Sequence, residues 1–192
     1  MRKVVVLASG NGSLLQALID APERGNQYEI VAVVSDKPEC FAIERARQAG
    51  ITEIAISFQK SQDNQWQQQL KDTVLGFNPD LVVSAGFMRI IRSDLFEVVP
   101  TINSHPSLLP NFPGAHAVAD ALAAGVEKTG ATVHSIDAGV DSGKILAQQS
   151  VPVYPNDSVQ SLHERIKVVE RIQLTQVVVK LCQQEDNWAG LH

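Results

Sequence analysis

Short apolar runs alternate with helical patterns along the first hundred residues. Apolar runs typical of strands buried on both faces of a parallel sheet occur at residues 4–8, 30–34, 53–56 and 81–84. Apolar residues recur at helical spacing between these runs, at residues 14–19, 43–50 and 62–75. This alternation predicts a doubly wound, mostly parallel sheet of the α/β class.

The pattern changes after Pro100. A short strand is expected at 101–103, then a proline-rich segment and a helix at 116–124. Two runs rich in β-branched residues, at 129–136 and 145–153, are expected to pair as antiparallel strands that extend the sheet. Asp157 and Ser158 are N-cap residues for a long C-terminal helix that reaches about residue 183.

Length and composition narrow the class of protein. With 192 residues, 44% of them hydrophobic, the chain is expected to form a single domain with an N-terminal half at about 1–100 and a C-terminal half at about 101–192. A net charge of −5 without a lysine or arginine run argues against nucleic acid and anionic membranes as partners. Cys40 and Cys182 lack metal or redox spacing. We expect a cytoplasmic protein that acts on small molecules.

Candidate chemistry is concentrated between Asn103 and Gly114. Three prolines within eight residues make this segment a stiff loop, and it follows a strand end, where ligands bind in open α/β sheets. Asn103 and His105 are two residues apart, so an extended backbone points both side chains to one face. The amide can donate a hydrogen bond to a developing oxyanion, and the imidazole can move a proton near neutral pH. A rigid turn with a capping Asn is the alternative.

A second candidate site is the glycine turn from Ser9 to Ser13. It joins the first expected strand to the first expected helix, so backbone amides at the helix start could hold a phosphate. Leu15 stands where a dinucleotide-binding turn has its third glycine, which disfavours a dinucleotide. A plain tight turn is the alternative.

Other polar residues cannot be assigned from their positions alone. Asp141 lies in a glycine-containing loop, either as a turn residue or as a carboxylate that favours a charged His105. His116 and His134 are either structural or site-lining. Glu170 falls within the apolar stripe of the last helix and needs a partner, in a salt bridge or in a ligand.

Two motifs together carry a family resemblance. Asn103-x-His105-Pro-Ser-Leu-Leu-Pro, followed by Asp141-Ser-Gly143, resembles the signature of folate-dependent formyltransferases, and the resemblance extends over about residues 3–182. It implies a Rossmann-like fold and catalysis by Asn103, His105 and Asp141. It also implies direct transfer of a formyl group from 10-formyltetrahydrofolate, without a metal, to the amine of glycinamide ribonucleotide in purine biosynthesis.

The resemblance implies binding residues as well. Those for the ribonucleotide are Gly12, Ser13, Leu14 and Glu170. Those for the folate are Met88, Arg89, Ile90, Ile91, Asn103, Asp137, Ala138, Gly139, Val140 and Asp141. Many family members have Asn in place of Leu14 and Gly in place of Ser142. They also carry a basic residue near the folate tail, where this chain reads Gln62-Asp-Asn-Gln65 and Lys60 is the nearest cation.

Three other functions are kept open. A formyltetrahydrofolate hydrolase shares the Asn, His and Asp, but such enzymes carry an additional N-terminal domain, and Pro106 with Phe112-Pro113-Gly114 favours the ribonucleotide enzymes. The family members that formylate methionyl-transfer RNA add a basic C-terminal domain. A non-catalytic nucleotide-binding module would not need a tuned proton donor. Whether the chain forms a homodimer is also open.

Overall fold

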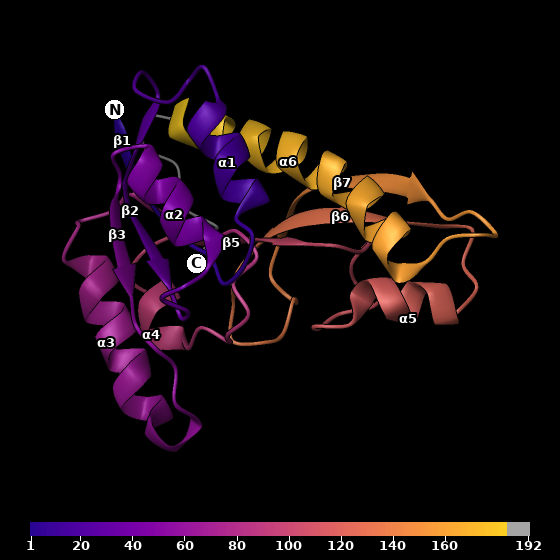
Figure 1. The fold of residues 1–192 in the computed structure, drawn as a ribbon, viewed down its shortest axis with the longest axis horizontal. Helices are drawn as coiled ribbons and strands as arrows, with labels where there is room; N and C mark the ends of the chain where they lie inside the picture. The colour runs from indigo at the N-terminus through magenta and orange to yellow at the C-terminus, as the bar shows by residue number, and fades with distance from the viewer. Residues whose placement is uncertain (184–192) are drawn as a thin grey trace.

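A seven-stranded sheet runs through the whole molecule in the computed structural model, which describes residues 1–183 (Figure 1). Its strands lie in the order β3-β2-β1-β4-β5-β6-β7. The first five strands pair in parallel, and β5–β6 and β6–β7 pair antiparallel. The bounds are β1 (Arg2–Leu7), β2 (Tyr28–Ser35), β3 (Thr52–Ala55), β4 (Leu81–Ser84), β5 (Thr101–His105), β6 (Lys128–Ser135) and β7 (Ile145–Pro152). The predicted doubly wound sheet with added antiparallel strands is confirmed.

Helices cover both faces of this sheet. Their bounds are α1 (Ser13–Asp20), α2 (Phe41–Gln48), α3 (Asp63–Leu75), α4 (Ser93–Phe96), α5 (Ala117–Ala123) and α6 (Val159–Gln183), with a 3-10 turn, η1, at Lys60–Gln62. Apolar residues of α1, α2 and α6 join one core cluster, and those of α3 and α4 join another. The predicted long C-terminal helix is confirmed. None of the helices within residues 1–183 is long and apolar enough to cross a membrane.

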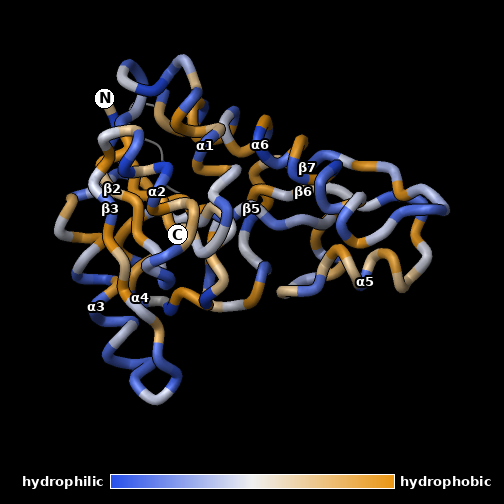
Figure 2. The backbone as a smooth tube through the Cα atoms, viewed as in Figure 1, coloured by the Kyte–Doolittle hydropathy of each residue, from blue (hydrophilic) through white to orange (hydrophobic). Residues whose placement is uncertain are grey.

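Alternation along β1 explains why two cores form. Val4 and Val6 face the cluster with α1 and α6, whereas Val5 and Leu7 face the cluster with α3 and α4. Apolar segments therefore run through the middle of the fold, as the hydropathy colouring shows (Figure 2). Full burial of such a side chain contributes roughly 1.5–3 kcal/mol to the stability of the fold.

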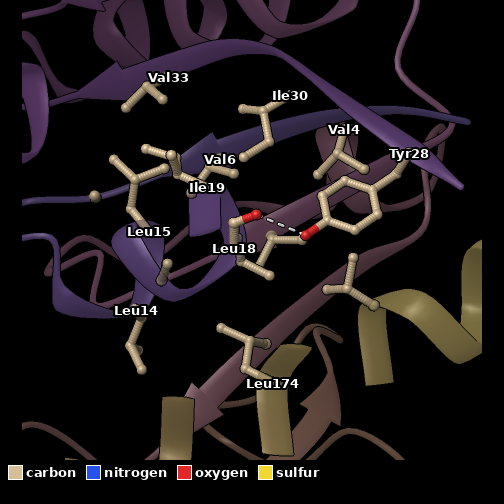
Figure 3. Close-up of a cluster of buried hydrophobic side chains, with 14 of the residues drawn as sticks. Val4, Val6, Leu14, Leu15, Leu18, Ile19, Tyr28, Ile30, Val33 and Leu174 are labelled. Carbon is tan, nitrogen blue, oxygen red and sulfur yellow. Dashed lines mark hydrogen bonds between the residues drawn. The ribbon is translucent and has the colours of Figure 1, made fainter. Parts of the chain in front are cut away.

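Tyr28 shows how a polar atom is accommodated in this core. Its ring is fully buried beside Val4 and Ile30, and its hydroxyl donates a hydrogen bond of 2.7 Å to the carbonyl oxygen of Leu18 (Figure 3). The bond satisfies a hydroxyl that would otherwise be buried without a partner.

Three local features differ from the expectation. β5 continues two residues past the predicted end at residue 103, because β6 pairs with it as far as His105, opposite Thr132. His105 therefore lies in the strand and not in the proline loop. The sequence pattern also missed η1 and α4, which have three and four residues and are too short to show a helical period.

Candidate active site

A cavity of about 490 Å³ opens at the carboxyl ends of the central strands. The chain winds outward from β1 to β2 and β3, and then returns to β4 on the other side of β1. This reversal between β1 and β4 is the switch point at which doubly wound sheets bind ligands. The two strand ends are joined there by a hydrogen bond of 3.2 Å from the Ser9 amide to the Gly86 carbonyl.

The glycine loop forms one wall of the cavity. Gly12 has a φ of 74° and occupies the N-cap position of α1. A Cβ atom at Gly12 would lie 2.9 Å from the Cα of Ala42, so the position has no room for a side chain. Leu14 is buried in the core and also contributes to the cavity lining. The first-turn amides of α1 have no partner within the helix and suit an anion.

Asn103, His105 and Asp141 meet in this cavity. The Asp141 carboxylate lies 3.3 Å from His105 Nδ1 and 3.5 Å from Asn103 Nδ2. It also accepts a hydrogen bond of 2.8 Å from the Gly114 amide. The proximity of Asp141 and His105, which the sequence could not decide, is thus a property of this fold: one residue follows β6 and the other ends β5.

His105 is held between two oxygen acceptors. Its Nε2 lies 2.8 Å from the carbonyl oxygen of Phe112, and its Nδ1 faces Asp141. Only an imidazole protonated on both nitrogens can donate to both oxygens. The two contacts fix the plane of the ring at the end of β5.

His134 lies against the same group. Its Nδ1 is 2.8 Å from the Ser135 carbonyl oxygen, and its Nε2 is 3.2 Å from Asn103 Nδ2 and 3.5 Å from Asp141. The ring therefore lies against both the Asn103 amide and the Asp141 carboxylate. Of its two predicted roles, His134 has the site-lining one.

The pKa of the Asp141 carboxyl reflects opposing effects. Burial by itself raises this pKa, but the hydrogen bonds with His134 and Gly114 and the charge of His105 outweigh burial. The net result is a pKa below the ordinary value of an aspartic acid. Asp141 is therefore an anion beside His105 at neutral pH.

The segment after β4 forms the apolar wall. Met88 and Ile90 are exposed, whereas Ile91 is buried. Backbone groups are fixed by the 2.8 Å hydrogen bond from the Met88 amide to Ser9 Oγ. Arg89 pairs with the buried Asp36 at 2.7 Å and lies over the Phe58 ring.

The loop between β6 and β7 forms the facing wall. Asp137 accepts hydrogen bonds from the Gly139 amide at 3.0 Å and from Ser142 Oγ at 2.7 Å, and these bonds close the loop. Asp137, Gly139 and Val140 line the cavity, and Ala138 does not.

The cation nearest to the expected position of the folate tail, Lys60, is not part of the cavity lining. Arg92 pairs with Asp63 and Asn64 at the start of α3.

Helix α6 closes the cavity on the side of the glycine loop. Glu170 is only 4% exposed, and Ser104 Oγ donates a hydrogen bond of 2.7 Å to it. Of its two predicted partners, a salt bridge or a ligand, the salt bridge is not formed among residues 1–183. Burial raises the pKa of this carboxyl, more than the Ser104 bond lowers it.

Two further titratable residues of α6 line the cavity and were not predicted. They are His163 and Lys167, which precede Glu170 by seven and three residues and therefore share its face of the helix. That spacing is the signal that could have found them. His116 lines the cavity from the N-cap position of α5, but its side chain makes no capping hydrogen bond.

No group of His, Cys, Asp and Glu among residues 1–183 is arranged to hold a metal ion.

Fold and site together define an α/β protein with a cavity at the switch point of its sheet, lined by residues suited to catalysis. The chain belongs to the formyl transferase family, whose sequence model matches residues 2–178. The predicted family resemblance is confirmed.

Two relatives illustrate the similarity. The chain is 49% identical over 183 residues to phosphoribosylglycinamide formyltransferase of Mycobacterium tuberculosis (strain ATCC 25618 / H37Rv), which covers 93% of this chain and 84% of that protein. It is 40% identical over 172 residues to the human trifunctional purine biosynthetic protein adenosine-3, which covers 88% of this chain and 17% of that protein.

Solved structures of formyltransferases have the same fold as this chain. Glycinamide ribonucleotide transformylase 1 from Symbiobacterium toebii has a TM-score of 0.89 at 34% identity, over 95% of this chain and 88% of that chain. Phosphoribosylglycinamide formyltransferase from Bacillus halodurans has a TM-score of 0.89 at 30% identity, over 97% of this chain and 98% of that chain.

Proposed function

We propose that this enzyme transfers the formyl group of 10-formyltetrahydrofolate to the amine of glycinamide ribonucleotide. The observation that carries the proposal is the meeting of Asn103, His105 and Asp141 in one cavity with the glycine loop. The names and activities of the relatives described above support the choice of substrates.

In the proposed reaction, the lone pair of the amine nitrogen attacks the formyl carbon, and the carbonyl oxygen becomes an oxyanion. Asn103 Nδ2–H and the charged His105 donate hydrogen bonds to that oxyanion. Collapse breaks the bond to N10 of the folate, which leaves with a proton, while the amine nitrogen loses one. The products are a formamide and tetrahydrofolate.

The distances support this division of roles. Both N–H groups of a charged His105 face protein acceptors, but the contact to Asp141, at 3.3 Å, is longer than the 2.8 Å contact to Phe112. Nδ1, the nitrogen with the longer protein contact, is therefore the one proposed to donate to the oxyanion. Asp141 stays close enough to receive a proton through water.

The ribonucleotide is proposed to lie between the glycine loop and α6. The amides of Gly12, Ser13 and Leu14 would hold the phosphate, with Lys167 as a counter-charge. Glu170 would accept hydrogen bonds from the ribose hydroxyls or the amine. A buried carboxyl with a single hydroxyl partner is suited to such a ligand.

The pterin is proposed to lie between the segment 88–91 and the loop 137–141. Apolar side chains with fixed backbone groups suit a flat heterocycle that has a donor–acceptor edge. Both walls line the same cavity as Asn103, so the formyl group would lie beside the amide.

The direct test is a spectrophotometric assay with 10-formyltetrahydrofolate, with and without glycinamide ribonucleotide. We expect rapid loss of the formyl group only when the ribonucleotide is present. Equally rapid loss in its absence would show a formyltetrahydrofolate hydrolase instead. A lack of turnover in both conditions, with folate or ribonucleotide still bound, would favour a binding module.

A further inference from the structure

Arg45 of α2 is joined to the glycine loop by its whole guanidinium group. Its Nε donates a hydrogen bond of 2.8 Å to the Asn11 carbonyl oxygen, and its Nη2 lies 3.2 Å from Asn11 Oδ1. Its Nη1 donates to Gln16 Oε1 of α1 at 2.8 Å. One side chain thus connects α2, the loop and the first turns of α1.

Backbone contacts reinforce this connection. The Ala42 amide donates a hydrogen bond of 3.1 Å to the Gly10 carbonyl oxygen. The Arg45 Cδ would lie 3.2 Å from a Cβ at Gly12, next to the Ala42 contact described above. The first turns of α2 therefore form the surface on which the loop rests.

The three acceptors around Arg45 are all neutral. They are a backbone carbonyl and two side-chain amide oxygens, and within residues 1–183 no salt bridge joins Arg45 to a carboxylate. The neighbouring Arg47, by contrast, pairs with Glu44 at 2.7 Å and Glu53 at 3.0 Å. The charge of Arg45 is left uncancelled beside the amides that start α1, in a half-buried position where solvent screens it less.

We propose that Arg45 is a positioning residue for the phosphate of the ribonucleotide substrate. It holds the glycine loop in the shape that presents the α1 amides, and its uncancelled charge raises the affinity of that loop for a dianion. The inference rests on the proposed function, because it assumes that the loop receives a phosphate. Arg45 itself does not need to touch the ligand, and it is not part of the cavity lining.

The first experiment separates positioning from general stability. Arg45→Met keeps the apolar stem and removes the three hydrogen bonds and the charge. We expect the KM for glycinamide ribonucleotide to rise about tenfold or more, because hydrogen bonds from a charged group to the loop are lost. The kcat and the KM for the folate should stay within about twofold.

Arg47→Met is the matched control on the same helix, since Arg47 is more exposed and bonds to Glu44 and Glu53 instead of the loop. It should leave both KM values unchanged. Arg45→Lys retains the charge but can make only part of the network, so its ribonucleotide KM should lie between those of the wild type and Arg45→Met. If Arg45→Met is too unstable to study, the lysine variant carries the same test.

A second experiment isolates the charge. Gln16 Nε2 donates to Asp20 Oδ1 at 2.8 Å, so Gln16→Glu combined with Asp20→Asn moves one carboxylate next to Arg45 without changing the net charge. The network keeps its shape, but Arg45 becomes neutralised. We expect phosphate binding to weaken roughly tenfold relative to Asp20→Asn alone.

Phosphate binding can be measured without catalysis, by titrating inorganic phosphate and following the amide NMR signals of Ser13 and Leu14. An unchanged phosphate Kd in Arg45→Met, or equal losses of kcat and folate affinity, would overturn the positioning role. An unchanged Kd in the Gln16→Glu, Asp20→Asn variant would overturn the electrostatic role. If the wild type fails to formylate the ribonucleotide, the proposed function fails, while the phosphate titration still decides the role of Arg45.

Discussion

Asp141 is the single residue on which the site geometry depends most. Its φ of 53° lies in the left-handed region, which costs free energy for a residue with a Cβ. Hydrogen bonds with Gly114, Asn103 and His134 hold it there, together with the charge of His105. Because these contacts lower its pKa, the stability that its charge contributes is present above about pH 4, the ordinary pKa, and is lost as the pH falls through the lower value of the folded state.

Asp141 and His105 are expected to act as a unit. Asp141→Asn keeps the size and removes the charge, so we expect kcat to fall about 10²–10⁴-fold, and His105→Ala should cause a loss in the same range. The double variant should be scarcely worse than the worse single variant. Steady-state rates for the four proteins test this. Losses that simply multiply would show that the two residues act independently.

We expect the glycine loop to require glycine at position 12, because a side chain there has no room and because the backbone has a positive φ. Gly12→Ala places a Cβ 2.9 Å from Ala42 Cα, which should shift the loop and raise the ribonucleotide KM at least about tenfold while folate binding is kept. Gly25→Ala is a matched control, because Gly25 has a similar positive φ of 87° but open space around it. Isothermal titration with each ligand checks this, and equal losses of both ligands in Gly12→Ala would contradict a dedicated phosphate loop.

At the scale of the elements, α6 combines a structural and a functional face. Leu162, Ile166 and Leu174 are fully buried against the sheet, while Lys167 and Glu170 reach the cavity. A long helix that packs on both the glycine-loop side and the β6–β7 side can therefore hold the ribonucleotide site in a fixed relation to Asn103 and His105.

Glu170→Gln is expected to stabilise the fold and to weaken ribonucleotide binding. Burial raises the pKa of Glu170 in the folded state. Protonated Glu170 therefore contributes to the free energy of unfolding below the unfolded pKa of about 4.3, and this contribution is lost as the pH rises through the folded pKa. Gln cannot ionise and can still accept the Ser104 hydrogen bond. We expect the variant to be more stable by about 1 kcal/mol at pH 7, with a smaller difference at pH 4.

The same variant should bind the ribonucleotide roughly tenfold more weakly, because a charged acceptor is lost. Urea unfolding at the two pH values, together with the ribonucleotide KM, tests both parts. The prediction is contradicted if the stability gained over the wild type is smaller at pH 7 than at pH 4.

At the scale of the whole molecule, one core crosses both halves of the chain. Val4 and Leu15 share a cluster with Ile102, Val133 and Leu174, which come from the second half. The sheet is likewise continuous from β3 to β7. The glycine loop comes from one half and Asn103, His105 and Asp141 from the other, so the continuous sheet holds the two proposed binding regions in a fixed relation.

We therefore expect unfolding to be a single cooperative transition. Calorimetry should give a van't Hoff enthalpy equal to the calorimetric enthalpy. A bound folate analogue at a hundred times its Kd should add about 2.7 kcal/mol to the free energy of unfolding and raise the Tm by roughly 5–11 °C, again in one transition. Two transitions, with only one of them shifted, would show that the halves unfold separately.

The order of strands and helices, and the positions of both motifs, could be determined from the sequence. Apolar runs such as 30–34 and 81–84 favour strands that are buried on both faces. Gly12 permits a turn with a positive φ, and Pro106 and Pro110 fix φ locally. These constraints act between near neighbours in the chain. The family resemblance added the function and a set of expected site residues.

Only the tertiary structure decided which distant residues meet. Asp141 reaches His105 because β6 pairs antiparallel with β5, and Arg45 reaches Asn11 because α2 packs against the glycine loop. Lys167 joins the cavity because α6 packs against α1 beside the glycine loop. Such distances between residues far apart in the chain depend on strand order, register and helix packing, which the pattern of apolar and polar residues specifies only in outline.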